Sequence, residues 1–340
     1  MKKIKSVVVI ILLISASSCF AQDPSFSQFF SSPLNINPAL TANINADWRV
    51  ISNLRDQWIG PASPYISGTV SFDRKILQHK VANTPENDNT VGVGAMIMYD
   101  YAMSGIQKSV YASLNMSYNV LLAEGDQAKH RLGAGFGATY GDRHIEFSRL
   151  DFQEQWTGFG FNTNLPTGES ALSNMKPHFS GNAGITYSFT TEKSNLDIGV
   201  AAFHFNRPKQ TFLEDPNQYL AMRKVAHGNF ETFINERTVL NINAVYQQQS
   251  SAHYYQAGGA LGYFLNDQAD VLLNAGVWYW SSNAIVPYIG FTYNNMQFGF
   301  SYDVTTSKLN RADRKPNTFE MSIILRGIVK PSGVIPCPWK

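Results

Sequence analysis

The sequence has very little cysteine. Its 340 residues include only Cys19 and Cys337, and Cys19 falls within a segment that we expect to be removed on secretion. The single remaining thiol cannot form an internal disulfide. The seven histidines are scattered and make no spacing typical of a zinc site. We therefore expect no disulfide, no metal and no other cofactor.

The sequence is also short of charge and of long hydrophobic runs. Charged residues make up 15% of the chain and the net charge is +2, so nucleic acid is not an expected partner. Beyond the N-terminal signal, no segment approaches the roughly 18 continuous apolar residues that a membrane-spanning helix requires. Transmembrane helices are therefore excluded, which leaves strands as the only elements that could cross a membrane.

The sequence lacks a recognisable catalytic arrangement. No Ser/His/Asp set can be assigned, and Gly133-x-Gly135-x-Gly137 lies within an alternating segment instead of at a strand-to-helix junction. These glycines are better explained as relieving crowding inside a barrel or as permitting a strand to bend. We expect the protein not to be an enzyme.

The first 21 residues have the organisation of a secretion signal. Lys2, Lys3 and Lys5 precede the short apolar run 7–14, and Ala21 supplies the small residue expected at a cleavage site. We predict a signal peptide at 1–21 and a mature start at Gln22. Lipid modification of Cys19 is the disfavoured alternative, because Ala16 and Ser18 depart from the usual lipoprotein motif.

What the sequence does contain is alternation with a period of two. In residues 109–122, Val110, Leu114 and Met116 share one face, while Ser113 and Asn115 share the other. A strand with this pattern has one apolar and one polar face. Similar segments recur near 47–55, 65–77, 90–101, 107–122, 129–142, 177–190, 195–206, 223–234, 236–248, 253–265, 269–281, 284–294, 296–304 and 317–326.

The connections between these segments alternate in length. Short ones fall at 123–128, 191–194, 235, 266–268 and 295, and long ones at 143–176, 207–222 and 305–316, with 78–89 as an exception. Such asymmetry is typical of outer-membrane barrels, and so are girdles of aromatic residues near strand ends, to which we assign Tyr99, Tyr140, Tyr254 and Trp278–Trp280. We predict an all-β fold: a transmembrane antiparallel β-barrel of about 14 strands over 47–326, of outer-membrane type. A soluble β-sandwich is disfavoured, because it rarely needs so many long strands.

Several charged residues lie on the polar face that would line the lumen: Asp100, Arg131, Asp303, Glu320 and Arg326. They could form a network of paired charges that fills the barrel, or a charged channel that selects solutes. We favour the network. The 143–176 loop carries Trp156, and we prefer a binding surface there to a disordered insert.

The two ends of the predicted barrel do not alternate. Residues 22–46 contain three prolines and are expected to lie inside the barrel as a plug or along its periplasmic mouth; residues 327–340 form a periplasmic tail. At the end of the first strand, Arg55 and Asp56 offer a local charge pair and Trp58 an interfacial aromatic. The candidate docking or structural residues are Asp23, Pro24, Phe26, Gln28, Pro33, Asn37, Pro38, Arg55, Gln57, Trp58 and Cys337.

These ends carry a family resemblance. The ordered motifs are Gln22-Asp23-Pro24-x-Phe26-Ser27-Gln28-Phe29, Pro33-Leu34-x-x-Asn37-Pro38-Ala39, Arg55-Asp56-Gln57-Trp58, Phe203-His204-x-Asn206, Gly299-Phe300-Ser301-Tyr302-Asp303, Phe319-Glu320-x-Ser322 and Ile335-Pro336-Cys337-Pro338. As a set they resemble the PorP/SprF family of outer-membrane proteins associated with type IX secretion and gliding motility.

The resemblance implies a non-enzymatic barrel that works through proteins. Its implied partners are outer-membrane lipid, a secreted type IX substrate such as an adhesin, and periplasmic lipoprotein ring components of the secretion machine. Its implied location is the bacterial outer membrane. A passive pore for solutes is the alternative function, suggested by the polar inner face, and an enzyme embedded in the membrane is a distant third.

Overall fold

The computed structural model describes residues 23–60, 63–78, 89–125, 127–169, 175–210, 218–266, 270–281, 283–307 and 316–327. The predicted signal peptide, Gln22 and the tail with Cys337 lie outside these ranges. Of the helices that they contain, none is long and apolar enough to cross a membrane.

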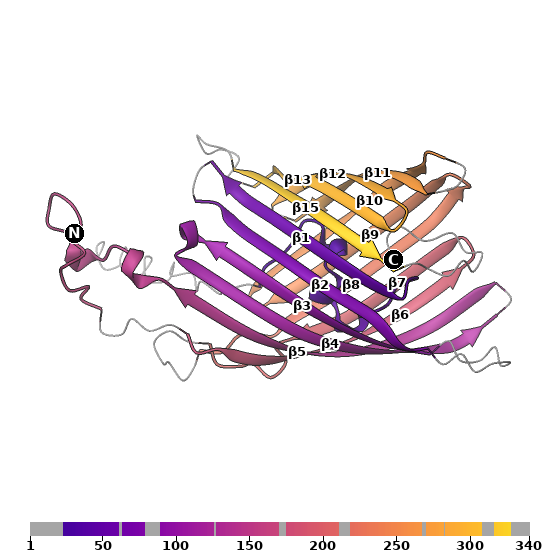
Figure 1. The fold of residues 1–340 in the computed structure, drawn as a ribbon, viewed down its shortest axis with the longest axis horizontal. Coiled ribbons are helices and arrows are strands. Elements are labelled where there is room, and N and C mark those ends of the chain that lie inside the picture. The colour runs from indigo at the N-terminus through magenta and orange to yellow at the C-terminus, as the bar shows by residue number, and fades with distance from the viewer. Residues whose placement is uncertain are drawn as a thin grey trace, which may run out of the picture.

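Strands dominate the described chain (Figure 1). They are β1 (Trp48–Ile59), β2 (Tyr65–Gln78), β3 (Thr90–Ala102), β4 (Gln107–Glu124), β5 (Ala128–Ile145), β6 (His178–Thr191), β7 (Ser194–Phe203), β8 (Arg223–Asn235), β9 (Thr238–Gln249), β10 (Ala252–Phe264), β11 (Val271–Trp280), β12 (Ala284–Tyr293), β13 (Met296–Tyr302), β14 (Val304–Thr305) and β15 (Asn317–Arg326). Short helices are η1 (Phe29–Ser31), α2 (Pro33–Ile36), η2 (Pro38–Leu40), η3 (Met103–Gly105), η4 (Phe147–Arg149) and η5 (Gln153–Gln155).

The strands close into a barrel. Sequence neighbours pair antiparallel from β1 to β13, and β15 closes the ring by pairing with both β13 and β1. The two-residue β14 continues β13 beyond Asp303, so the ring has 14 strands, as predicted. The largest errors in the predicted boundaries are at three strands. β1 continues past 55 to Ile59 through a bulge, β5 extends past 142 to Ile145, and β7 ends at Phe203 instead of 206, before a turn at His204 with φ of 56°.

The alternation sets which way each side chain points. On β4, Leu114 is 71% exposed on the outside, whereas Ser113 is 5% exposed on the inside. The same outward apolar band runs around the other strands, with Ile97, Phe136 and Ile289 all strongly exposed. An apolar outer surface of this kind is compatible with the hydrocarbon core of a membrane. The closed ring pairs the backbone N–H and C=O groups of the strands, which water cannot hydrogen bond within that core.

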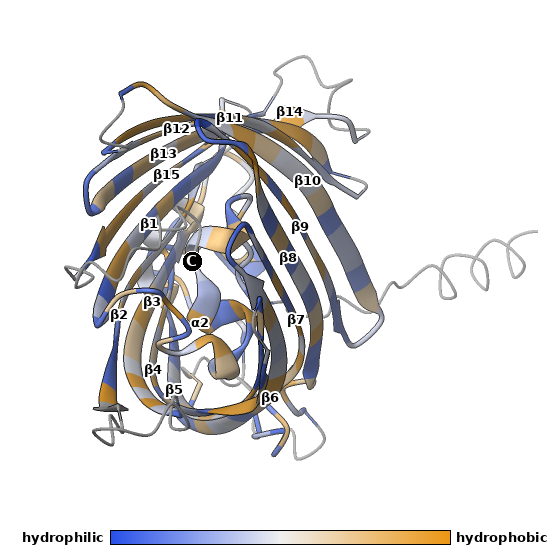
Figure 2. Cartoon of the chain, turned by 90° about the vertical axis from the view of Figure 1, so that its right-hand side faces the viewer, coloured by the Kyte–Doolittle hydropathy of each residue, from blue (hydrophilic) through white to orange (hydrophobic). Residues whose placement is uncertain are grey.

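Residues 23–46 lie inside this ring, and Figure 2 shows α2 surrounded by strands. We call them the N-terminal segment. Its prolines divide it into short pieces, with Pro33 and Pro38 each at the start of a helical turn, a position that proline favours. Asn37 caps η2, because its Oδ1 accepts a hydrogen bond from Ala39 N at 2.8 Å.

The lumen is apolar on one side, whereas the alternation had indicated a polar inner face. Phe29 and Ile36 of the N-terminal segment pack with Val245, Trp278 and other inward residues of β7–β12 in one buried cluster. Figure 2 shows hydrophobic patches on the inner segment as well as on the strands. The buried hydrophobic core therefore joins the segment to the inside of the wall.

The predicted aromatic girdles need a matching correction. Tyr99, Tyr140 and Tyr279 are exposed on the outside, as a girdle requires, but Trp278 and Trp280 are 1% and 8% exposed and face inward. Because a strand alternates, the Trp278–Trp280 run sends its two tryptophans to the face opposite Tyr279.

The two ends of the barrel differ. Connections 192–193, 236–237 and 294–295 are two residues long and share one end, which we call the short-turn end. The long β5–β6, β7–β8 and β14–β15 connections share the opposite, long-loop end. The short helices η4 and η5 of the β5–β6 loop stand away from the barrel (Figure 1), and Trp156 there packs on Phe161 with ring centroids 4.9 Å apart.

Candidate functional site: a vestibule above the N-terminal segment

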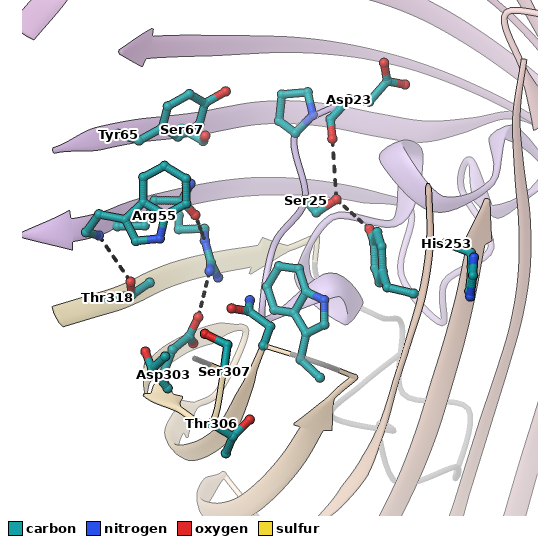
Figure 3. A pocket seen from close by; sticks show the side chains of 17 residues that line it. Asp23, Ser25, Arg55, Tyr65, Ser67, His253, Asp303, Thr306, Ser307 and Thr318 are labelled. Atoms are coloured by element: carbon teal, nitrogen blue, oxygen red, sulfur yellow. Dashed lines mark hydrogen bonds and ion pairs between the residues drawn. The ribbon is translucent and has the colours of Figure 1, made fainter. Parts of the chain in front are cut away.

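A cavity of about 1080 Å³ opens at the long-loop end (Figure 3), and we call it the vestibule. Its lining comprises Asp23, Pro24, Ser25, Arg55, Gln57, Trp58, Tyr65, Ser67, His253, Tyr254, Trp280, Asn283, Asp303, Thr305, Thr306, Ser307 and Thr318. Five of the residues singled out from the sequence, Asp23, Pro24, Arg55, Gln57 and Trp58, thus meet at one site. The N-terminal segment contributes part of its lining.

Arg55 projects from β1 into the lumen, where it is 2% exposed. It makes ion pairs with Asp303 at 2.6 Å and with Glu320 at 3.3 Å, and its Nε donates to Gln57 Oε1 at 2.9 Å. The proposed local pair with Asp56 does not form, because consecutive strand residues point to opposite faces. Arg55 instead ties β1 to the β13–β15 side of the barrel.

The same carboxylates hold the N-terminal segment. Glu320 accepts hydrogen bonds from the backbone N of Ser27 at 2.7 Å and of Gln28 at 3.1 Å. Ser27 Oγ donates to Asp303 Oδ1 at 2.7 Å, and Gln28 Nε2 donates to the Glu320 carbonyl at 2.9 Å. Each carboxylate thus binds both Arg55 and the segment, so the wall and the segment share one buried polar network.

Asp23 holds the start of the N-terminal segment, on the side of the lumen formed by β8 and β9. Its carboxylate lies 2.7 Å from His204 Nε2 and 3.0 Å from Arg223 Nε, and its backbone N donates to Gln249 Oε1 at 2.8 Å. Burial alone would raise the pKa of Asp23, but His204 and Arg223 hold it well below its ordinary value. Asp23 is therefore held in the lumen by His204, Arg223 and Gln249.

Trp58 occupies an unusual backbone position. The register between β1 and β15 shifts between Asp56 and Ile59, and Trp58 within this bulge has a φ of 67°. A left-handed conformation is costly for a bulky residue, by about 1–3 kcal/mol. The bulge directs the indole, which is 45% exposed, to the vestibule beside Tyr65, with ring centroids 6.4 Å apart.

The remaining candidates lie deeper in the lumen. Phe26 is 2% exposed and packs with Met98 and Tyr111. Asn37 Nδ2 donates to the carbonyls of Ile185 at 3.1 Å and Val200 at 3.2 Å. Pro33 lines a cavity of about 80 Å³ between the segment and the wall. These residues hold the segment in place and do not line the vestibule.

Close approach between the segment and the wall explains the glycines of β5. A Cβ on Gly135 would collide with the backbone of Pro38 and Ala39. On β3, a Cβ on Gly92 would come within 2.6 Å of Ala42 Cβ. Of the two explanations offered for the β5 glycines, crowding in the lumen holds at Gly135.

At the short-turn end, Asp73 anchors the other end of the segment. Asp73 Oδ2 accepts from Ala42 N and from Arg49, both at 2.7 Å. The segment is therefore held at both ends and at its middle.

Sequence reasoning did not single out Arg223 or Gln249, and it assigned Tyr254 and Trp280 to the aromatic girdles, whereas both line the vestibule. Arg223 and Gln249 lie opposite each other on β8 and β9, inside the barrel and beside Asp23. Both are inward-facing polar residues at a strand end next to a long loop, and this position could have marked them as site candidates from the sequence. Their partner Asp23 lies more than 180 residues away along the chain, so the sequence pattern could not reveal the pairing.

The vestibule has no metal-binding character in the part of the chain that the structure describes. Those residues contain no group of three or more His, Cys, Asp or Glu side chains that could hold a metal ion. The vestibule is lined by ion-paired charges, by neutral hydrogen-bonding groups and by aromatic rings.

Comparison with known proteins identifies the family. A family model described as "Type IX secretion system membrane protein PorP/SprF" matches residues 18–325, which include both the N-terminal segment and the barrel. The chain belongs to the PorP/SprF family. This membership and the closed barrel make it a membrane protein of type IX secretion, in agreement with the resemblance drawn from the sequence motifs.

A search of curated proteins found no match to this PorP/SprF chain. Among solved structures, the toluene transporter TodX of Pseudomonas putida is similar, with 12% identity, a TM-score of 0.47, and coverage of 90% of this chain and 94% of TodX. A FadL homologue of Pseudomonas aeruginosa has 13% identity and a TM-score of 0.47, with coverage of 85% and 92%. Omp33 of Acinetobacter baumannii has 8% identity and a TM-score of 0.39, with coverage of 83% and 98%. Sequence identity and structural similarity this low give no information about the activity of this chain.

Proposed function

We propose that this protein is a non-enzymatic component of the type IX secretion system in the bacterial outer membrane, where it supports the secretion or surface attachment of a partner protein. The observation that carries the proposal is the N-terminal segment inside the barrel, in a member of a secretion family. A segment that occupies the lumen suits a protein that acts by docking.

The two ends offer different surfaces for docking. With the short turns in the periplasm, as is usual for such barrels, the vestibule and the β5–β6 loop face the cell exterior. A secreted adhesin would meet the long-loop end, and lipoprotein ring components of the machine would meet the short-turn end. Gliding motility follows where the secreted partner is an adhesin.

A passive solute channel is the competing function. The polar residues on the inner face of β3–β6 would favour it, but the segment packs directly against those strands. Asn37 hydrogen bonds to β6 and β7, and Ser117 of β4 donates to the Thr41 carbonyl at 2.6 Å. These contacts between the segment and the strands support docking over passive passage of solutes.

Deleting the gene tests the proposal. We expect at least one large surface protein to disappear from the cell surface, and to accumulate in the periplasm or be shed into the medium, because its outer-membrane partner is missing. Surface proteomics of the deletion strain, with a strain complemented by the wild-type gene as control, measures this. An unchanged set of surface proteins would contradict the proposal.

A further inference from the structure

The vestibule has the composition of a ligand site that neither the fold nor the family accounts for. Its volume of about 1080 Å³ is slightly above the range for small-molecule pockets, which is roughly 300–1,000 Å³. It can therefore hold a ligand of several linked rings, much larger than an ion.

The buried charges around the vestibule are already matched. Arg55 is paired with Asp303, and Asp23 with Arg223 and His204. A charged ligand would have to displace one of these buried pairs, which is costly. Because these charged groups are already paired with each other, the vestibule favours an uncharged ligand.

The neutral lining has two components. Two aromatic pairs contribute rings, Trp58 with Tyr65 from β1–β2, and Tyr254 with Trp280 from β10–β11, the latter with centroids 5.5 Å apart. Hydroxyl and amide side chains fill the space between, including Asn283, Thr305, Thr306 and Thr318. Flat aromatic faces beside neutral donors and acceptors match sugar rings, which have apolar C–H faces and a rim of hydroxyl groups.

Trp58 points to the same conclusion independently. A bulky residue held at a φ of 67° in a bulge is strained, and such strain gathers at ligand sites. The indole makes no buried core contact that would explain the strain, since it is 45% exposed and reaches the vestibule.

We propose that the vestibule binds an uncharged oligosaccharide, with a sugar ring stacked on Trp58 and its hydroxyl groups bonded to the Thr305–Thr306 side. The site is independent of the secretion proposal: loss of glycan binding and loss of a surface protein are separate measurements, and either can fail alone. The glycan can come from membrane glycolipid or from a glycosylated protein.

Titration calorimetry of the purified full-length protein tests this with two probes. One is the polysaccharide released by mild acid from the lipopolysaccharide of the producing bacterium, and the other is the pool of glycans released from its surface proteins. We expect one of them to bind, and the one that binds identifies the source. Trp58→Ala should weaken binding at least about tenfold, equivalent to about 1.4 kcal/mol, while Trp58→Phe, which keeps a ring, should bind close to wild type.

Trp48→Ala is the matched control, because Trp48 is a similarly exposed tryptophan at the opposite end of β1. It should bind as the wild type does. Heat-modifiable migration on a gel checks that each variant forms a barrel. If Trp58→Ala does not fold, Trp58→Leu, which removes the ring but keeps an apolar side chain, replaces it and should weaken binding to the same extent. The proposal is overturned if neither probe binds, or if Trp58→Ala binds as tightly as wild type. It is also overturned if an unstructured proline-containing peptide displaces the bound glycan and binds more tightly.

Discussion

Replacing Arg55 with methionine is expected to lower the free energy of unfolding by about 3–5 kcal/mol, because the change leaves buried carboxylates without their cation. Asp303 and Glu320 are 3% and 0% exposed, so water cannot take over the role of the guanidinium. Both carboxylates also hold Ser27 and Gln28 of the N-terminal segment. The substitution should therefore weaken the attachment of the N-terminal segment as well as destabilise the barrel wall.

Denaturant titration of the protein refolded into lipid vesicles, followed by tryptophan fluorescence, measures the effect. Arg74→Met on neighbouring β2 is the control, because Arg74 is exposed on the outside of the barrel; it should change stability little. The triple variant Arg55→Met, Asp303→Asn, Glu320→Gln removes the unpaired charges and should recover part of the loss. Equal stability of Arg55→Met and wild type would show that the cluster does not support the fold.

Replacing Gly135 with valine is expected to release the N-terminal segment while leaving the barrel closed. A Cβ at Gly135 collides with backbone atoms of Pro38 and Ala39, which cannot rotate away as a side chain can. The wall around Gly135 is held by pairing with β4 and β6. Displacement of the segment is therefore the easier response.

Cysteine labelling reports the release. In a Cys337→Ser background, Ser31→Cys should resist a water-soluble maleimide, because Ser31 is fully buried in the lumen; adding Gly135→Val should make it react. Gly133→Val is the matched control on the same face of β5, since the atoms nearest to a Cβ there belong to the side chains of Asn119 and Thr186 and not to the backbone of the segment. Equal protection of Ser31→Cys in all three proteins would contradict a segment held by contact at Gly135.

The sequence was sufficient to predict the barrel because the signal is local. Lipid outside the wall requires an apolar residue at every second position, as in Val110, Leu114 and Met116, and each strand carries this pattern without reference to its neighbours. The alternation of apolar and polar residues is less clear where the inward-facing residues are also apolar. Trp278 and Val245 face inward to meet Phe29, so β7–β12 are less clearly two-sided.

The contents of the lumen could not be predicted in the same way. Arg55 and Glu320 are 265 residues apart, and Asp23 and His204 are 181 apart. A pattern of period two tells which face a residue occupies but not what lies across the lumen. The motifs at the N-terminus identified residues that matter, such as Gln28 and Asn37, while their partners required the structure.

Single-channel recording tests most directly whether the barrel is a docking protein with an occupied lumen. Purified wild-type protein in a planar bilayer is expected to show no steady open-channel current, because the N-terminal segment is fixed to Asp303, Glu320, Asp73 and the wall at Gly135. Gly135→Val should conduct, and Gly133→Val should remain silent. Steady open currents from the wild-type protein would contradict the account and favour a solute channel.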